Sequence, residues 1–238
     1  MTNKIALITG ANKGIGFEVA RQLAAKGYTI LLGARDPQRG EEAAAKIPGA
    51  TAITLDLNLP ESVIDAAREI EQTHGRLDVL VNNAGIGEIG VDGLPGVANL
   101  DAVRRTFDTN FFGSLAVSQA MLPLLRKSSA ARIVNVSSTL GSIAIQGDPT
   151  HPYSAFKSIG YAASKAALNM LTVNLAYELR DTPAKVNSAC PGYVATDLNN
   201  HSGYRTVEQG AAIVVHLATL DPDGPSGGFF DDNGSIPW

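Results

Sequence analysis

The chain has 238 residues, of which 45% are hydrophobic and 18% are charged. This composition is close to the globular average and excludes disordered and fibrous proteins. The formal net charge of −4 provides no overall field to attract a nucleic acid. The apolar run 5–8 is too short for a signal peptide, and no later run reaches the length of a membrane span. We therefore expect one cytoplasmic domain over 1–238, with neither a nucleic-acid nor a membrane partner.

The cysteine and histidine content gives no indication of a metal site. Cys190 is the only cysteine, so an intrachain disulfide is excluded and a packing role is expected. The histidines lack both the i, i+4 spacing and the partner cysteines of zinc sites; they are His74, His151, His201 and His216. We expect that the protein binds no metal.

Apolar segments of strand length alternate with segments of helical periodicity, which is typical of βαβ units on a parallel sheet. The predicted strands are 5–9, 29–34, 51–55, 77–81, 132–136, 185–189 and one that begins at 227. The predicted helices run from 15 to a stop at Gly27, then over 37–47, 60–73, 100–127, 159–179 and 206–220. Two long segments, 85–99 and 141–158, are expected to be loops. The pattern predicts an α/β Rossmann fold, a doubly wound parallel sheet with helices on both faces.

A glycine cluster, G-x-x-x-G-x-G, lies between the first predicted strand and helix. Its glycines are Gly10, Gly14 and Gly16. Glycine at these positions allows a tight turn and close approach of a pyrophosphate, whose charge is met by free N–H groups and the helix dipole. The position at the first βα turn indicates a dinucleotide site.

Thr9 and these glycines form the pattern T-G-x-x-x-G-x-G, which resembles the first motif of the short-chain dehydrogenase/reductase family. The resemblance extends over nearly the whole chain. It implies a single NADP(H)-binding catalytic domain. It also implies that the glycine turn contacts the cofactor through Gly10, Asn12, Lys13, Gly14, Ile15 and Gly16.

The end of the second strand indicates which cofactor is used. Ala34 stands where an NAD-type relative has an acid that binds the ribose 2′-hydroxyl, and Arg35 follows it. Together with Lys13, Arg35 supplies cations for a 2′-phosphate, and Arg39 is a weaker candidate. The alternative is that both are solvated surface charges. The resemblance favours NADP(H).

Three further segments match family motifs that border the cofactor. Asp56-Leu57 resembles the adenine-contacting pair, and Asn82-Asn83-Ala84-Gly85 matches N-N-A-G. The segment 191–196 resembles P-G-x-V-x-T, which holds the nicotinamide end. The resemblance thus implies cofactor contacts at Asp56, Leu57, Asn83, Ala84, Gly85, Pro191, Gly192, Val194 and Thr196, and also at Tyr161 and Lys165.

Two Tyr-x-x-x-Lys pairs compete for the catalytic role, Tyr153 with Lys157 and Tyr161 with Lys165. On a helix this spacing places both side chains on one face, where the ammonium favours ionisation of a phenol whose ordinary pKa is about 10. The second pair begins a long amphipathic helix and resembles Y-x-A-S-K-A-A-L, whereas the first lies in a proline-containing loop. We therefore assign Tyr161 and Lys165 as catalytic.

The resemblance assigns two more catalytic residues. Ser138, at the end of the fifth strand, matches the serine that donates to the substrate oxygen, with Ser137 as the less favoured alternative. Asn110 matches the asparagine that positions the lysine through a water. Asparagine is unfavourable inside a helix, which is an independent indication of a functional role.

Tyr161 lies 23 positions after Ser138, more than is usual in the family. The excess resembles an insertion found in the carbonyl-reductase branch and is expected to border the substrate pocket. Because of this insertion, the identity of the substrate stays open. The oligomeric state also stays open, between a homodimer or homotetramer and a monomer.

These residues predict NADPH-dependent reduction of a ketone or aldehyde, or the reverse alcohol oxidation, on a small-molecule substrate. A ketoacyl or sugar reductase would use the same machinery. A regulatory protein that senses NADPH without catalysis is an alternative from another class, although it would not need all four catalytic positions.

Overall fold

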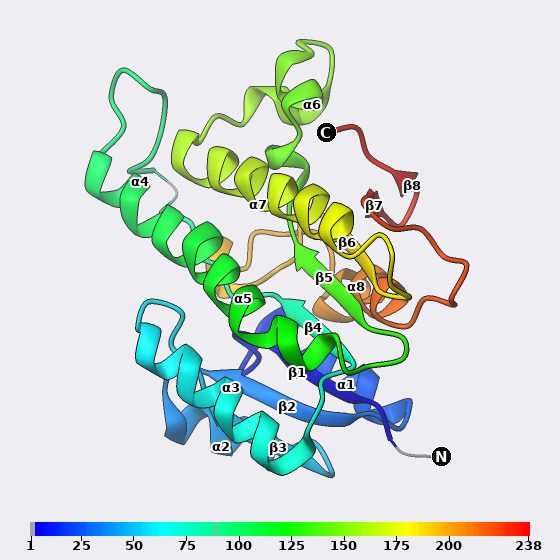
Figure 1. The fold of residues 1–238 in the computed structure, drawn as a ribbon. Helices are drawn as coiled ribbons and strands as arrows, with labels where there is room; N and C mark the ends of the chain where they lie inside the picture. The colour runs from blue at the N-terminus through cyan, green and yellow to red at the C-terminus, as the bar shows by residue number, and fades with distance from the viewer. Residues whose placement is uncertain (1–2, 89) are drawn as a thin grey trace.

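The computed structural model describes residues 3–88 and 90–238 and has the predicted α/β architecture. Its eight-stranded sheet has the order β3-β2-β1-β4-β5-β6-β7-β8 (Figure 1). Strands β1 to β7 are parallel and β8 is antiparallel to β7. The strands are β1 (Ile5–Ile8), β2 (Thr29–Ala34), β3 (Ala50–Thr54), β4 (Val79–Asn82), β5 (Arg132–Val136), β6 (Lys185–Ala189), β7 (Phe229–Asp231) and β8 (Gly234–Ser235).

Helices cover both faces of the sheet, as the near-continuous apolar strands require. They are α1 (Gly14–Ala25), α2 (Pro37–Ala44), α3 (Pro60–His74), α4 (Leu100–Phe107), α5 (Ser114–Leu125), α6 (Ile143–Gly147), α7 (Ile159–Glu178) and α8 (Val207–Ala218). Shorter turns are η1 (Asp108–Gly113), η2 (Thr139–Gly141), η3 (Pro152–Ala155) and η4 (Asp197–Asn199).

The core has two layers, one on each face of the sheet. Ala6 and Ile8 of β1 pack in the layer under α1 and α8, whereas Ile5 and Leu7 pack in the layer under α3, α5 and α7. This division follows from the period of two of a β-strand. Because β1 lies between β2 and β4, the chain reverses direction along the sheet at this point, where open α/β sheets bind ligands.

The structure corrects the predicted helix over 100–127. It is interrupted by the π-helical turn η1 (Asp108–Gly113), which separates α4 from α5. Gly113 packs closely on Leu57, since a Cβ at Gly113 would lie 2.7 Å from the Leu57 Cβ. Hydrophobic periodicity does not detect one inserted residue, so the sequence predicted a continuous helix.

Two other regions differ from the sequence expectation. The predicted loop 141–158 contains α6 and η3, and the last strand folds back as the β7–β8 hairpin. The carboxyl-terminal residues pack on the loop: the Ser142 hydroxyl donates to the Pro237 carbonyl at 2.6 Å, and the Ala144 N–H donates to the Trp238 carbonyl at 3.0 Å (Figure 1).

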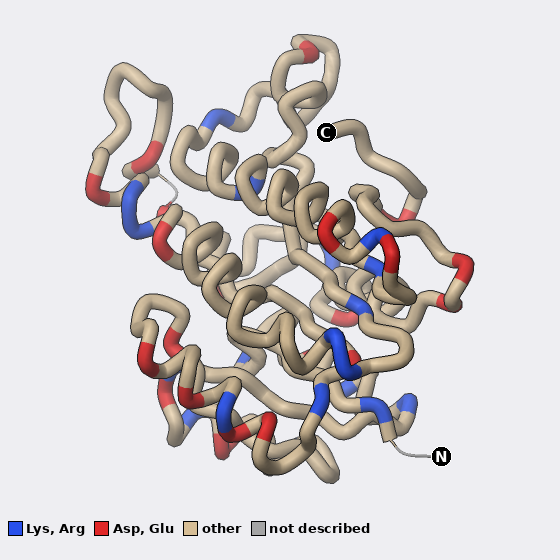
Figure 2. Tube along the Cα trace, viewed as in Figure 1, with Lys and Arg blue, Asp and Glu red and all other residues tan. Residues whose placement is uncertain are grey.

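Lysine and arginine are interspersed with aspartate and glutamate along the chain (Figure 2). No helix in the described part of the chain is long and apolar enough to cross a membrane. Among the same residues, no group of three or more histidine, cysteine, aspartate or glutamate side chains is arranged to hold a metal ion.

Candidate functional site

The predicted glycine turn has the backbone that its residues were expected to allow. Gly10 and Gly14 both have a φ of 60°, in the left-handed region that favours glycine. A Cβ at Gly10 would lie 2.9 Å from the Ala84 Cα, and one at Gly16 only 2.3 Å from the Asn83 Nδ2. A side chain at either position would therefore displace the neighbouring segment.

The N-N-A-G segment is fixed directly to this turn. The Thr9 hydroxyl accepts from the backbone N–H of Asn83 at 3.0 Å and of Ala84 at 2.9 Å. The Asn83 side chain donates to the Thr9 and Gly10 carbonyls at 2.8 and 3.1 Å. The turn before α1 is thus fixed by hydrogen bonds to the N-N-A-G segment. No side chain caps the start of α1 itself. Uncapped N–H groups at a helix start suit a phosphate, so these residues fit a dinucleotide.

A shallow hollow of about 290 Å³ beside this turn is lined by cations. Lys13, Arg39 and Lys46 border it, together with Asn12 and Glu42. The Lys13 ammonium forms an ion pair with Asp197, which sequence reasoning missed and which lowers the pKa of the Asp197 carboxyl. At side-chain exposures of 61% and 52% this pair is open to water and weak.

Ala34 is buried at the end of β2, and Arg35 follows it in an exposed position. The next residue, Asp36, is used as the cap of α2, where its side chain accepts from the Arg39 N–H at 3.1 Å. Arg35 makes no ion pair with any residue that the structure describes. The guanidinium therefore remains available for a ligand at this strand end.

Asp56 and Leu57 follow β3 at the same edge of the sheet. The Asp56 backbone N–H donates to the Ser62 hydroxyl at 2.9 Å, and its carboxylate accepts from the Asn58 N–H at 3.0 Å. Leu57 lies against Gly113 of η1. The pair is thus fixed on both sides, and its contact with adenine stays a prediction.

The predicted nicotinamide segment after β6 lies opposite the glycine turn. A Cβ at Gly14 would be 3.8 Å from the Thr196 Cγ2. Gly192 has a φ of 77°, and its missing side chain leaves room for Arg205. The Asn199 side chain donates to the Val194 carbonyl at 2.8 Å and accepts from the Thr196 N–H at 3.2 Å. Pro191 and Val194 are buried, so the segment is packed against the protein interior while its Thr196 faces the glycine turn.

Tyr161 and Lys165 lie one turn apart on α7, as predicted. The Lys165 ammonium donates to the Val136 carbonyl at 2.8 Å and lies 5.6 Å from the centre of the Tyr161 ring. Lys165 is 4% exposed, and burial lowers its pKa to about 8. Burial also raises the pKa of Tyr161 to about 12, which corrects the expectation that the neighbouring ammonium would lower it; the nearby Cys190 adds to this increase and Ser138 opposes it.

The two serine candidates are separated by their surroundings. The Ser138 hydroxyl caps η2 by accepting from the Leu140 N–H at 3.2 Å, and Ser138 is close enough to Tyr161 to oppose the increase in the pKa of that phenol. Ser137 is buried and points to the Lys165 carbonyl at 3.5 Å. Of the two serines, only Ser138 acts on the Tyr161 phenol, and its catalytic role stays a prediction.

Asn110 is fully buried in the π-helical turn η1. Its side chain forms two hydrogen bonds with the Ile86 backbone, at 2.8 and 2.9 Å, and donates to the Ser164 hydroxyl at 3.0 Å. A Cβ at Gly85 would lie 3.2 Å from the Asn110 Oδ1 and 3.4 Å from the Lys165 Nζ. Asn110 and Lys165 thus approach Gly85 together, and π-helical turns often occur at such functional positions.

The competing pair lies outside this cluster. Tyr153 belongs to η3, and its hydroxyl is hydrogen-bonded to that of Tyr204 at 3.0 Å. The exposed Lys157 ammonium donates to the Gln146 carbonyl at 2.9 Å. The chain between them is not α-helical, so the shared four-residue spacing does not place the two side chains on one helix face.

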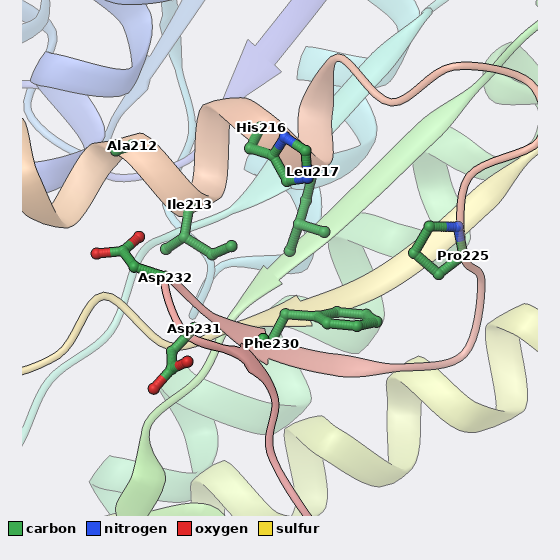
Figure 3. A pocket seen from close by; sticks show the side chains of 9 residues that line it. Ala212, Ile213, His216, Leu217, Pro225, Phe230, Asp231 and Asp232 are labelled. Atoms are coloured by element: carbon green, nitrogen blue, oxygen red, sulfur yellow. The ribbon is translucent and has the colours of Figure 1, made fainter.

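A second hollow, of about 430 Å³, contains none of the predicted site residues. It lies between α8 and the β7–β8 hairpin and is lined by side chains such as Leu217, Phe230 and Asp231 (Figure 3). The catalytic candidates are on α7, across the sheet from α8.

Comparison with known proteins agrees with the motifs. Residues 4–205 match the model of the short chain dehydrogenase family. The chain is 38% identical to a short-chain dehydrogenase of Penicillium roqueforti, with 92% of this chain and 90% of that protein covered. It is 32% identical to carbonyl reductase (NADPH) 1 of Mus musculus, with 98% of both covered.

Among solved structures, the NADPH-bound carbonyl reductase from chicken fatty liver superimposes with a TM-score of 0.86 at 29% identity, over the full length of both chains. Salutaridine reductase of Papaver somniferum has a TM-score of 0.82 at 30% identity, over 97% of this chain and all of that one. These similarities indicate the same family as the glycine turn and the Tyr-x-x-x-Lys helix do. The chain belongs to the short chain dehydrogenase family.

Proposed function

We propose that the protein is an oxidoreductase that reduces a ketone or aldehyde with NADPH, or oxidises the alcohol in reverse, with Tyr161 as the general acid. The observation that carries this proposal is the convergence of Ser138, Tyr161 and Lys165 at the ends of β5 and α7. The relatives named as carbonyl reductases support the same reaction class.

The chemistry requires a proton donor and an oxyanion stabiliser at one oxygen. When bound, NADPH supplies the hydride that adds to the carbonyl carbon. The Ser138 and Tyr161 hydroxyls hold the carbonyl oxygen, and the Tyr161 phenol transfers its proton to that oxygen as negative charge develops there. In the reverse direction the same phenolate accepts the alcohol proton.

The electrostatics of the site suit this role. With its pKa raised to about 12, the Tyr161 phenol is protonated near neutral pH and can donate. The pKa of Lys165 is about 8, so its ammonium remains charged below that pH and stabilises the phenolate left after proton transfer. Asn110 fixes the Ile86 backbone and Ser164 beside them, and so keeps this part of the site rigid.

The cofactor assignment depends on the charges at the end of β2. Ala34 provides no carboxylate to bind a ribose 2′-hydroxyl, and Arg35 stands exposed beside it. Lys13 borders the adjacent hollow and is able to exchange its exposed pairing with Asp197 for a phosphate. The mouse relative is an NADPH carbonyl reductase, and the chicken carbonyl reductase structure contains bound NADPH.

Turnover of NADPH with a panel of ketones, aldehydes, ketoacyl thioesters and sugars tests the proposal, followed by loss of the reduced-nicotinamide absorbance. Consumption with simple ketones or aldehydes supports it. Tight NADPH binding without turnover of any substrate would instead favour a sensing protein. Turnover confined to ketoacyl or sugar substrates would favour the related reductases.

Arg35→Ala tests the cofactor assignment. The variant loses a charge-assisted contact that only the 2′-phosphate makes, so kcat/KM for NADPH should fall about tenfold or more while the value for NADH is unchanged. Arg68→Ala, which removes an exposed cation of α3 paired with Asp65, is the matched control. Equal preference of the parent protein for both cofactors would contradict the assignment.

A further inference from the structure

The first turn of α7, which carries Tyr161, is capped from a distant segment. Asp92 lies between β4 and α4 and is fully buried. One of its carboxylate oxygens accepts from the Tyr161 backbone N–H at 2.8 Å, and the other accepts from the Ser158 hydroxyl. The Asp92 carbonyl accepts from the Ile159 N–H at 2.9 Å. Asp92 thus accepts hydrogen bonds from backbone N–H groups at the start of α7, although Tyr161 lies 69 positions later in the sequence.

This arrangement replaces the usual local cap. Ser158 occupies the N-cap position of α7, yet its side chain accepts no hydrogen bond from the helix. Its hydroxyl donates to Asp92 instead. A carboxylate at a helix start is also favoured by the helix dipole. A Cβ at Gly160 would be 2.8 Å from the Asp92 Oδ2, so glycine at this position is what permits the close approach.

The segment that carries Asp92 is itself held near the reacting groups. Its Ile86 is bound to the Asn110 side chain, and Glu88 forms two hydrogen bonds of 2.7 Å with the Arg105 guanidinium on α4. Gly87 lies against the Tyr161 ring, since a Cβ there would be 3.1 Å from the Tyr161 Cδ2. The segment therefore contacts Tyr161 at both its backbone and its ring.

From this geometry we infer that Asp92 is a positioning residue: its carboxylate fixes the first turn of α7 so that the Tyr161 hydroxyl meets the substrate oxygen. The inference rests on the proposed function of Tyr161. It assigns a role in the reaction to a side chain outside the family motifs described above. A displacement of the phenol by a fraction of an ångström would reduce the rate of proton transfer without weakening cofactor binding.

Two variants and two measurements test the inference. Asp92→Ala removes every side-chain acceptor, whereas Asp92→Asn retains one for the Tyr161 N–H. Hydrogen exchange of the amides at 159–161 should accelerate about tenfold in Asp92→Ala and much less in Asp92→Asn. Unchanged exchange in β5 shows that both variants are folded. This arm needs no turnover, so it stands even if the panel of carbonyl compounds shows no activity.

In the kinetic arm, Asp92→Ala should lower kcat about tenfold with little change in the Kd for NADPH, and Asp92→Asn should recover most of the loss. Thr206→Ala, which removes the side-chain cap of α8, is the control and should leave kcat near the parent value. In a Tyr161→Phe background, the effect of Asp92→Ala on the residual rate should disappear.

Each other result overturns the inference. Unchanged exchange in Asp92→Ala would show that the cap contributes nothing to α7. Faster hydrogen exchange in Asp92→Ala with a kcat equal to that of the parent would show that the cap is only structural. The same conclusion would follow if Asp92→Ala lowered kcat equally in the parent and in the Tyr161→Phe background. Equal kinetic losses in Asp92→Ala and Asp92→Asn would exclude the hydrogen bond to Tyr161 as the cause. Absence of turnover in the parent protein contradicts the proposed function instead.

Discussion

Two segments of this protein share the spacing Tyr-x-x-x-Lys and differ in almost everything else. Tyr161 and Lys165 lie on an α-helix over the sheet, and Lys165 is buried. Tyr153 and Lys157 span a short 3₁₀ turn and an extended stretch, where Lys157 is exposed and binds the Gln146 carbonyl.

The comparison shows that the same four-residue spacing lies on an α-helix in one segment and in a 3₁₀ turn with an extended stretch in the other. Both tyrosines have a pKa raised to about 12, but for different reasons. Burial is the main cause at Tyr161, whereas at Tyr153 it is the hydrogen bond with the Tyr204 hydroxyl. An altered tyrosine pKa alone would therefore not distinguish the proposed catalytic pair from the other.

The largest difference between the pairs should be in turnover. Tyr161→Phe keeps the ring but removes the proposed proton donor, so kcat should fall at least about a hundredfold while NADPH binding survives. Tyr153→Phe should alter KM or selectivity more than kcat. Steady-state kinetics of both variants measure the contrast. If Tyr153→Phe abolished turnover and Tyr161→Phe did not, the catalytic assignment would be wrong.

The lysines should differ in the pH dependence of stability. The folded-state pKa of Lys165, about 8, lies below its ordinary value of 10.5. The cost of burying the ammonium is therefore fully present below pH 8 and decreases as the pH rises toward 10.5. The parent should gain about 2 kcal/mol of unfolding free energy relative to Lys165→Met between about pH 7 and about pH 9.5.

Urea unfolding of the parent and of Lys165→Met at the two pH values measures this difference. Lys157→Met, which removes an exposed ammonium, is the control. Its unfolding free energy should differ from that of the parent by the same amount at both pH values. A pH-independent difference for Lys165→Met as well would show that Lys165 is not buried as described.

The smallest effect is expected at the Tyr153–Tyr204 contact. Tyr204→Phe removes the main cause of the raised pKa of Tyr153, which should fall from about 12 toward 10. A tyrosinate absorbance titration, with Tyr153→Phe/Tyr204→Phe as the blank, measures this change. If the contact borders the substrate, KM should change a few-fold at constant kcat. An unchanged Tyr153 titration would show that the hydroxyl pair does not form in solution.

The half of the molecule built from β1 to β4 was predictable in detail. Strands β1, β2 and β4 are mostly apolar, and glycine is required where the backbone turns at Gly10 and Gly14 or where Asn83 approaches Gly16. Such requirements are local, so they are visible in the sequence. The sites of Tyr161 and Lys165 were predictable for the same reason, because one helix carries both.

The remaining features depend on contacts between distant segments and had no local signal. Nothing near Asp92 indicates that it caps α7, and nothing near Lys13 indicates its pairing with Asp197. The same holds for Cys190, expected only to pack: its thiol contacts Thr139, next to the proposed catalytic residue Ser138, and contributes to the raised pKa of Tyr161. Such contacts are set by topology rather than by residue pattern.

The π-helical turn η1 makes this part of the chain sensitive to the deletion of a single residue. A π-turn differs from an α-helical one by a single residue, and each residue of an α-helix advances about 100° around the axis. Deletion of one residue within 108–113 would let α4 and α5 join as one regular helix. The π-turn absorbs one extra residue by advancing less per residue, so α4 and α5 would keep nearly the same relative orientation. The residues inside the turn would instead change their position around the axis, and Asn110 would no longer face both Ile86 and Ser164. A one-residue deletion here would therefore be more damaging than most substitutions, although it makes the helix more regular.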